Sequence, residues 1–275
     1  MNSVAGLIKS SLGKKFVMAG SGALLLLFVI GHLIGNLQVF GPPELINKYA
    51  HFLQSKPLMV WGARLGLLVI VALHIITAIQ LSVANKAARP VGYASGDSYG
   101  STWQSRYMLM SGIVILAFII YHLAHFTVRL SWINGVGDFT KIKTVLHGET
   151  VPDVYAMMIL GFQVWWVSAF YLVAQALLFI HLGHGISSAF QSFGLRNHVW
   201  WPRIQLLAKV VSIAIFLGYA SIPAAIFMRV VGADYAEKAK HQLTSIIDTQ
   251  MPASGKEVMN IIEGELKASS RKETH

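Results

Sequence analysis

The sequence predicts an all-α membrane protein with five transmembrane helices, and three observations support this fold class. Only 12% of the 275 residues are charged, about half the share of an ordinary soluble domain. More than half of the residues, 55%, are hydrophobic. The apolar residues also gather in five segments, each longer than the roughly 20 residues that a helix needs to cross the hydrocarbon core. These segments are residues 16–40, 58–84, 107–128, 154–190 and 204–228.

Each segment has its own character. The first, residues 16–40, has no charged residue and is too long for the apolar core of a cleavable signal peptide. The second is interrupted by Arg64, whose long side chain can reach the membrane surface. The third and the fifth have ordinary spanning lengths. The fourth, residues 154–190, would measure about 55 Å as one helix, so we expect it to tilt or to project beyond the bilayer.

The chain is predicted to divide into a transmembrane domain, residues 1–232, and a polar carboxyl-terminal tail, residues 233–275, which we expect to be solvated. The first four helices are expected to form the functional bundle. The loop at residues 129–153 is long for a helical bundle, which indicates a structured cap on the outer face. No internal repeat is evident beyond the apolar segments themselves.

Composition also excludes several kinds of site. The chain has no cysteine, so it cannot form disulfides or bind an iron–sulfur cluster through thiolates. Its net charge of +10 is typical of basic loops that meet anionic lipid headgroups, and nucleic acid is a poor alternative partner. Lysine and arginine are concentrated before the first helix and after the second and fourth, which places the amino terminus in the cytoplasm.

Six histidines lie within the apolar segments. Ionisable residues are costly inside a membrane and, by default, mark function there. By helix depth, one pair lies nearer the outside and one pair nearer the cytoplasm. Two pairs at matched depths on neighbouring helices are what bis-imidazole haem ligation needs, whereas zinc sites or proton relays favour cysteines or carboxylates. The six are His32, His74, His122, His125, His181 and His184.

The spacing does not choose every ligand. His122 with His125, and His181 with His184, are three residues apart and so lie on nearly one face of their helices. Either member of each pair can therefore be the ligand, while the other bonds a propionate, a quinone or a carbonyl group.

Five motifs in order carry a resemblance to a known family. They are "GHLIGNLQVF", "NKYAHFL", "WGARLGLLVIVALHI", "YHLAHFT" and "IHLGHGISSAFQSFG". With them, residues 7–231 resemble the single-chain, five-helix, two-haem cytochrome b subunit of succinate dehydrogenases and quinol:fumarate reductases, which belong to respiratory complex II.

The resemblance implies the haem ligands residue by residue. His32 and His122 match the axial ligands of the iron in the outer haem b, and His74 and His181 match those of the inner haem b. In the third and fourth helices the family pattern favours these residues over their neighbours. The second choices there are His125 and His184.

The resemblance also implies the partners. Such a chain anchors a flavoprotein subunit and an iron–sulfur subunit on the cytoplasmic side of the bacterial inner membrane and passes electrons to menaquinone or ubiquinone. It is part of an enzyme only as a subunit, because it carries no dinucleotide motif and no cysteine for succinate dehydrogenation. Arg64, Trp103 and Arg106 are candidates for contacts with propionates or quinone, beside ordinary structural roles.

Two alternatives remain open at this point. One is another dihaem cytochrome b anchor, of the hydrogenase or formate dehydrogenase type, in which the ligands would be placed differently. The other is a non-redox membrane scaffold or transporter whose histidines pack or relay protons. A reduced-minus-oxidised spectrum separates the second alternative from the haem proteins.

Overall fold

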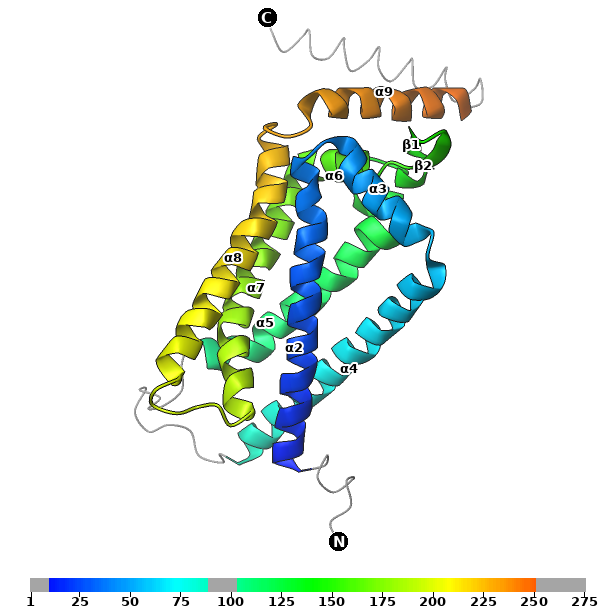
Figure 1. Ribbon diagram of the computed structural model, residues 1–275. Helices are drawn as coiled ribbons and strands as arrows, with labels where there is room; N and C mark the ends of the chain where they lie inside the picture. Colours follow the sequence, from blue (N-terminus) through cyan, green and yellow to red (C-terminus); the bar gives the residue numbers. More distant parts are fainter. Residues whose placement is uncertain (1–9, 89–102, 251–275) are drawn as a thin grey trace, which may run out of the picture.

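The fold is an all-α membrane protein, seen in a computed structural model that describes residues 10–88 and 103–250 (Figure 1). Side chains are described in these ranges except at residues 103–106 and 246–250. Within the described residues, five helices are long and apolar enough to cross a membrane, which confirms the predicted number of spans. Their outer surfaces carry large exposed apolar side chains such as Leu27, Leu68 and Leu206, as contact with lipid requires.

The five spanning segments lie side by side as a bundle. Helix α2 packs against α4 and α7, and α7 also packs against α5 and α8. Two spans end in tighter or wider turns: a 3₁₀ turn, Leu37–Phe40, follows α2, and a π-helical turn, Leu123–Val128, follows α5. The α-helical bounds are Ser11–Asn36 for α2, Pro57–Ala87 for α4, Trp103–His122 for α5, Trp165–Ser192 for α7 and Trp201–Phe227 for α8.

Four shorter features close one end of the bundle, which we call the capped end; the opposite end is the open end. They are helix α3 (Pro43–Gln54), the antiparallel hairpin of β1 (Lys143–Leu146) and β2 (Glu149–Pro152), helix α6 (Val154–Gln163) and helix α9 (Ala233–Gln250). Figure 1 shows α9 lying across this end. The hairpin and the short turns around it form the structured cap that the long loop predicts.

The prediction of one continuous helix over residues 154–190 is wrong. The chain breaks at Val164, whose backbone is extended, so that α6 and α7 are separate helices. The hydroxyl group of Ser168 donates to the carbonyl oxygen of Phe162 at 2.5 Å and satisfies an acceptor that the break leaves free. Because α6 is buried by protein on every side, it is as apolar as a helix embedded in lipid, and composition alone does not separate the two cases.

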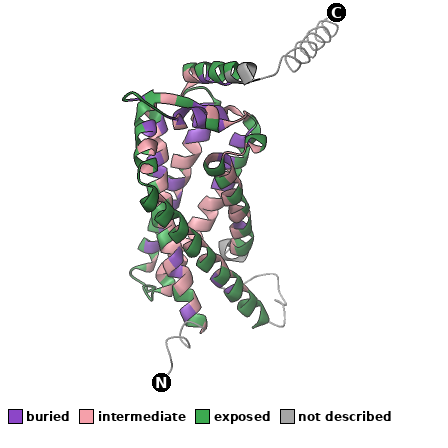
Figure 2. Cartoon of the chain, turned by 90° about the vertical axis from the view of Figure 1, so that its right-hand side faces the viewer, coloured by how far each residue is buried: buried purple, intermediate pink, exposed green. Residues whose placement is uncertain are grey.

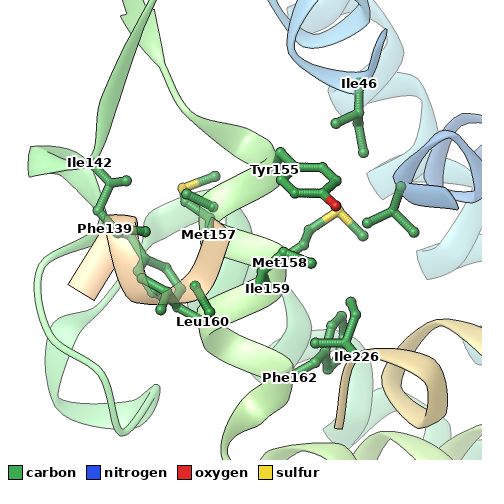
Figure 3. Packing of buried hydrophobic residues seen from close by; sticks show 14 of the residues in the cluster. Ile46, Phe139, Ile142, Tyr155, Met157, Met158, Ile159, Leu160, Phe162 and Ile226 are labelled. Atoms are coloured by element: carbon green, nitrogen blue, oxygen red, sulfur yellow. The ribbon is translucent and has the colours of Figure 1, made fainter. Parts of the chain in front are cut away.

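The cluster of buried hydrophobic residues lies at the capped end of the bundle, and Figure 2 colours the chain by burial. Phe139, Ile142 and Ile159 are fully buried there, together with Ile226 at the end of α8. Figure 3 shows Phe139 and Ile142 from the segment before β1, Ile46 from α3 and Ile226 from α8 around the side chains of α6. This cluster fixes the ends of the spanning helices relative to one another.

Helix α9 belongs to this cluster. Ala236, Ala239 and Leu243 are buried, so the expectation of a solvated tail is wrong for the first turns after Gly232. The hydroxyl group of Tyr235 donates to the carboxylate of Asp153 at 2.5 Å. Residues 251–275, the remainder of the predicted tail, lie outside the described residues.

Gly232 lies at the junction of α8 and α9, and a side chain at this position should destabilise the cap. Its φ is +73°, and a Cβ atom there would overlap the side chain of Ile159. We expect Gly232→Ala to lower the free energy of unfolding by about 2–4 kcal/mol, from backbone strain and overpacking together. Thermal unfolding in detergent measures the change.

Gly148 is the matched control. It also has a positive φ, +83°, but a Cβ atom there meets open space. Gly148→Ala should therefore cost only the backbone strain, about 1 kcal/mol. Equal losses in the two variants would show that the contact with Ile159 is unimportant.

Candidate functional site

The bundle brings four of the intramembrane histidines together as two facing pairs. His32 on α2 faces His122 at the end of α5, with ring centroids 5.7 Å apart and ring planes 80° apart. His74 on α4 faces His181 on α7, with centroids 6.4 Å apart and planes 63° apart. We call the first the capped-end pair and the second the open-end pair. All four rings are partly buried between the helices.

The two pairs lie at different depths. The His74 ring touches α2 at Ser21, and His32 lies eleven residues further along the same helix. The His181 ring touches α5 at Ser111, and His122 again lies eleven residues further on. Eleven residues of α-helix span about 16 Å. The capped-end and open-end pairs are therefore separated by about this distance along the bundle on both sides.

Hydroxyl groups hold three of the four rings through Nδ1. The Oγ atom of Ser21 lies 3.2 Å from Nδ1 of His74, and that of Ser111 lies 3.0 Å from Nδ1 of His181. Tyr171 on α7 places its hydroxyl group 3.2 Å from Nδ1 of His122. The ring of His32 is held by stacking, since Phe28 lies parallel to it at 5.4 Å.

His125 does not join the capped-end pair, although it follows His122 by three residues. His125 lies within the π-helical turn, Leu123–Val128. Its ring is fully buried beside Phe139, and a Cβ atom on Gly161 would approach its Nε2 atom to 3.2 Å. His125 makes no described ring contact with His32, so of the two histidines on this turn His122 is the one that faces α2.

Tyr171 nevertheless links these two histidines. Its hydroxyl group also lies 3.1 Å from Nδ1 of His125. A tyrosine hydroxyl group has one proton, so it donates to one of the two rings and accepts from the other. The Nε2 atom of His125 is buried and has no hydrogen-bond partner.

His184, the second choice on α7, is partly buried and forms no ring contact with His74. Its backbone carbonyl accepts a hydrogen bond from Ser187 at 3.0 Å. The geometry therefore offers His181, and not His184, to the helix that carries His74. That any of these histidines binds iron stays a prediction.

The donor set fits a metal that brings its other ligands with it. Within residues 10–88 and 103–250, no group of three or more His, Cys, Asp or Glu side chains converges to hold an ion, so a closed tetrahedral site of the zinc type has no ligands there. Each pair offers two opposed imidazoles. A metal bound at about 2 Å by one nitrogen of each ring would separate the ring centroids by about 6 Å, which is close to the observed separations.

Sequence reasoning missed Ser21, Ser111 and Tyr171. A signal for the two serines is present in the sequence, because the first and third spans share the pattern M-x-x-S-G-x5-F-x3-H. It runs from Met18 to His32 and again from Met108 to His122. The phenylalanines of the pattern, Phe28 and Phe118, stack on the histidine that follows four residues later. The two helices thus form a repeat that hydropathy alone does not reveal.

The other polar candidates lie apart from the histidine pairs. The guanidinium group of Arg64 packs over the ring of Trp61 at 5.1 Å, on the first turns of α4. The side chains of Trp103 and Arg106 lie outside the described residues.

Comparisons of the chain with protein-family models, with curated proteins and with solved structures found no match.

Proposed function

We propose that this chain is a dihaem cytochrome b that anchors a succinate:quinone oxidoreductase in the bacterial inner membrane. His32 and His122 would ligate one haem b, and His74 and His181 the other. The observation that carries the proposal is the pair of facing imidazoles at each of two depths in one apolar bundle. The imidazoles in these contacts come from four helices and lie within the membrane, where ionisable groups are energetically unfavourable.

The chain's own residues hold and orient the ligands and keep water away. A haem held between two imidazoles would supply one-electron transfer. Phe28 and Phe118 cover the rings of the capped-end pair. Tyr219 on α8 lies 6.3 Å from the ring of His32 and donates to the carbonyl oxygen of Val29 at 2.8 Å, which ties α8 to α2 beside the pair.

The placement of the two histidine pairs favours electron transfer between the two ends of the bundle.

The distribution of charge supports the expected orientation, with the open end in the cytoplasm. Within the described residues the open end carries basic side chains and no acidic ones, as the positive-inside rule favours. These basic residues are Lys14, Lys15, Lys86, Arg196 and Arg203.

The rest of the proposed complex must lie on other chains. This chain has no cysteine for iron–sulfur clusters, and the sequence carries no dinucleotide-binding motif. Succinate oxidation and the clusters are therefore assigned to a flavoprotein and an iron–sulfur subunit that dock at the open end, with membrane quinone as the other electron carrier. The order and spacing of the histidine motifs support this family over the other dihaem anchors.

Purified chain should contain two haems b. We expect a reduced-minus-oxidised spectrum with a b-type α-band, and a pyridine haemochrome assay that gives two haems per chain, since each facing pair completes one bis-imidazole site. A colourless protein would exclude the proposal and favour a scaffold or transporter. One haem per chain would show that one of the two pairs is structural.

Copurification separates succinate:quinone oxidoreductase from the other haem proteins. A flavoprotein and an iron–sulfur protein should accompany the chain from native membranes, and the preparation should reduce a soluble quinone analogue with succinate. Two haems together with hydrogenase or formate dehydrogenase subunits would keep the dihaem assignment and overturn the assignment to complex II.

A further inference from the structure

We infer that Ser21 and Ser111 are positioning residues that hold His74 and His181 in one tautomer. Each serine oxygen accepts the Nδ1 proton of its histidine, so that each imidazole presents an unprotonated Nε2 atom between α4 and α7. The inference rests on the proposed function only in the role that it gives to the Nε2 lone pairs, which is to bind iron. The position of the protons can be tested with or without haem.

The proton count at Ser21 decides the direction of its hydrogen bond. A serine hydroxyl group has one proton, and that of Ser21 points to the carbonyl oxygen of Met18 at 3.1 Å. The contact of 3.2 Å with Nδ1 of His74 must therefore be donated by the histidine.

The same count holds at Ser111. Its hydroxyl group donates to the carbonyl oxygen of Met108 at 3.0 Å, which uses its proton. Its oxygen lies 3.0 Å from Nδ1 of His181, so this histidine is again the donor. Serine often donates to a carbonyl of the preceding turn inside helices. Here that ordinary bond is what turns each hydroxyl oxygen toward a histidine as an acceptor.

The residue after each serine supports the same role. A Cβ atom on Gly22 would come within 3.2 Å of Cε1 of His74, and one on Gly112 within 3.6 Å of Cε1 of His181. The absence of a side chain there lets each ring approach its helix closely enough to reach the serine. The Ser-Gly dipeptide thus forms the contact site for an imidazole from a neighbouring helix. It occurs at the same place in both repeats of M-x-x-S-G-x5-F-x3-H.

The capped-end pair is built differently, which makes the inference specific to the open-end pair. His122 shares the single hydroxyl group of Tyr171 with His125, and the ring of His32 is held by stacking. Loss of Ser21 or Ser111 should therefore affect one pair and leave the other unchanged. A hydrogen-bond acceptor at the other ring nitrogen raises the basicity of a metal-bound imidazole, which makes its iron harder to reduce.

The first test locates the protons directly. We propose ¹⁵N NMR of ¹⁵N-histidine-labelled full-length chain, kept reduced because bis-imidazole ferrous haem is diamagnetic, with signals assigned by single His→Gln variants. His74 and His181 should be protonated at Nδ1. Ser21→Ala should shift the Nδ1 signal of His74 alone, and Ser111→Ala that of His181 alone. An unprotonated Nδ1 in either wild-type ring, or no shift in either variant, would overturn the inference.

The second test reads the consequence at iron. Ser21→Ala and Ser111→Ala should each raise the midpoint potential of the haem bound by His74 and His181. The potential of the haem bound by His32 and His122 should not change. The low-spin EPR g values of the haem bound by His74 and His181, which depend on the angle between the imidazole planes, should change with its potential. Ser21→Thr and Ser111→Thr keep the hydroxyl group and should restore both readouts. Shifts of both haems, or of neither at full haem content, would contradict a positioning role.

Ser212 on α8 is the matched control. It is buried and donates to the carbonyl oxygen of Lys209 at 3.1 Å, the same local bond, but it has no histidine partner. Ser212→Ala should change neither the NMR signals nor the potentials. If the wild-type chain binds no haem, the proposed function fails, while the NMR experiment still decides the tautomers. If it binds two haems and the Nδ1 protons are absent, only this inference fails.

Discussion

Replacement of His122 by alanine is expected to remove one of the two haems, whereas replacement of His125 should leave both in place. His122 faces His32 across the bundle at 5.7 Å, and no other described histidine lies in ring contact with His32. The His125 ring lies against Gly161 instead. Haem content per chain, measured by pyridine haemochrome, should therefore halve in His122→Ala and stay at the wild-type value in His125→Ala.

The proton on Tyr171 supports the same choice. If Nε2 of His122 is to bind iron, its Nδ1 atom must carry a proton and donate to the oxygen of Tyr171, at 3.2 Å. Tyr171 then donates to Nδ1 of His125, whose own proton lies on the buried Nε2 atom without a partner. A buried unpaired donor costs about 1–3 kcal/mol, and removing the His125 ring relieves this cost while leaving Tyr171 free to accept from His122.

Companion variants complete the assignment. His32→Ala should remove the same haem as His122→Ala, and His74→Ala and His181→Ala should both remove the other one, as shown by which midpoint potential disappears. Loss of a haem in His125→Ala with retention in His122→Ala would show that the wrong residue was chosen in this turn. Loss of different haems in His32→Ala and His122→Ala would show that the pairing is wrong.

Asp153→Ala is expected to destabilise the cap more than any other single polar substitution in it. The buried carboxylate accepts hydrogen bonds from the side-chain amide of Asn47 at 2.9 Å, from the backbone N–H of Ala156 at 2.9 Å and from the hydroxyl group of Tyr235 at 2.5 Å. These bonds join α3, the start of α6 and α9. Their joint loss should lower the free energy of unfolding by about 3–5 kcal/mol, because two donors lose a charged partner and α6 loses its N-cap.

Asp234→Ala is the control, because this carboxylate is exposed in the same cap and should change stability by less than about 0.5 kcal/mol. Denaturation in mixed micelles gives the free energies, and hydrogen exchange of α9 reports the local loss. Equal stability of Asp153→Ala and wild type would show that the network does not hold the cap together.

The same network predicts loss of the cap at alkaline pH. Burial, together with the hydrogen bond to Asp153, raises the pKa of Tyr235 above its ordinary value of about 10. A raised pKa in the folded state means that this contribution to stability is complete below pH of about 10 and is lost as the pH rises further. Tyr235→Phe should remove that alkaline transition from the exchange of α9.

Hydropathy predicts the spanning helices well because lipid imposes a simple rule on them. Around 20 apolar residues without charge must be helical in a bilayer, and the structure has all five spans, although the fourth begins at Trp165 and not at residue 154. The rule fails at α6, because eight consecutive residues of this helix, Tyr155–Phe162, are buried by protein and not by lipid. Helix α3 was missed for the opposite reason, since its polar residues give no spanning signal.

The candidate site follows from the sequence as far as depth along regular helices determines it. Depth alone groups His32 with His122 and His74 with His181, and these are the rings that face each other. Spacing could not choose between His122 and His125, because the two follow each other where the helix passes into a π-helical turn, and such a turn depends on tertiary packing. The serine contacts depend on which helices become neighbours, although the repeated pattern around Ser21 and Ser111 marks the positions.

The repeat of M-x-x-S-G-x5-F-x3-H has a consequence for how the protein is made. Each half of the chain, α2 with α4 and α5 with α7, supplies one histidine to each pair, so neither half holds a complete pair alone. During synthesis the capped-end pair is complete only once residue 122 has left the ribosome, and the open-end pair only once residue 181 has. Under the dihaem proposal, cofactor loading therefore waits for the second half to insert, and a chain truncated after α4 would stay empty.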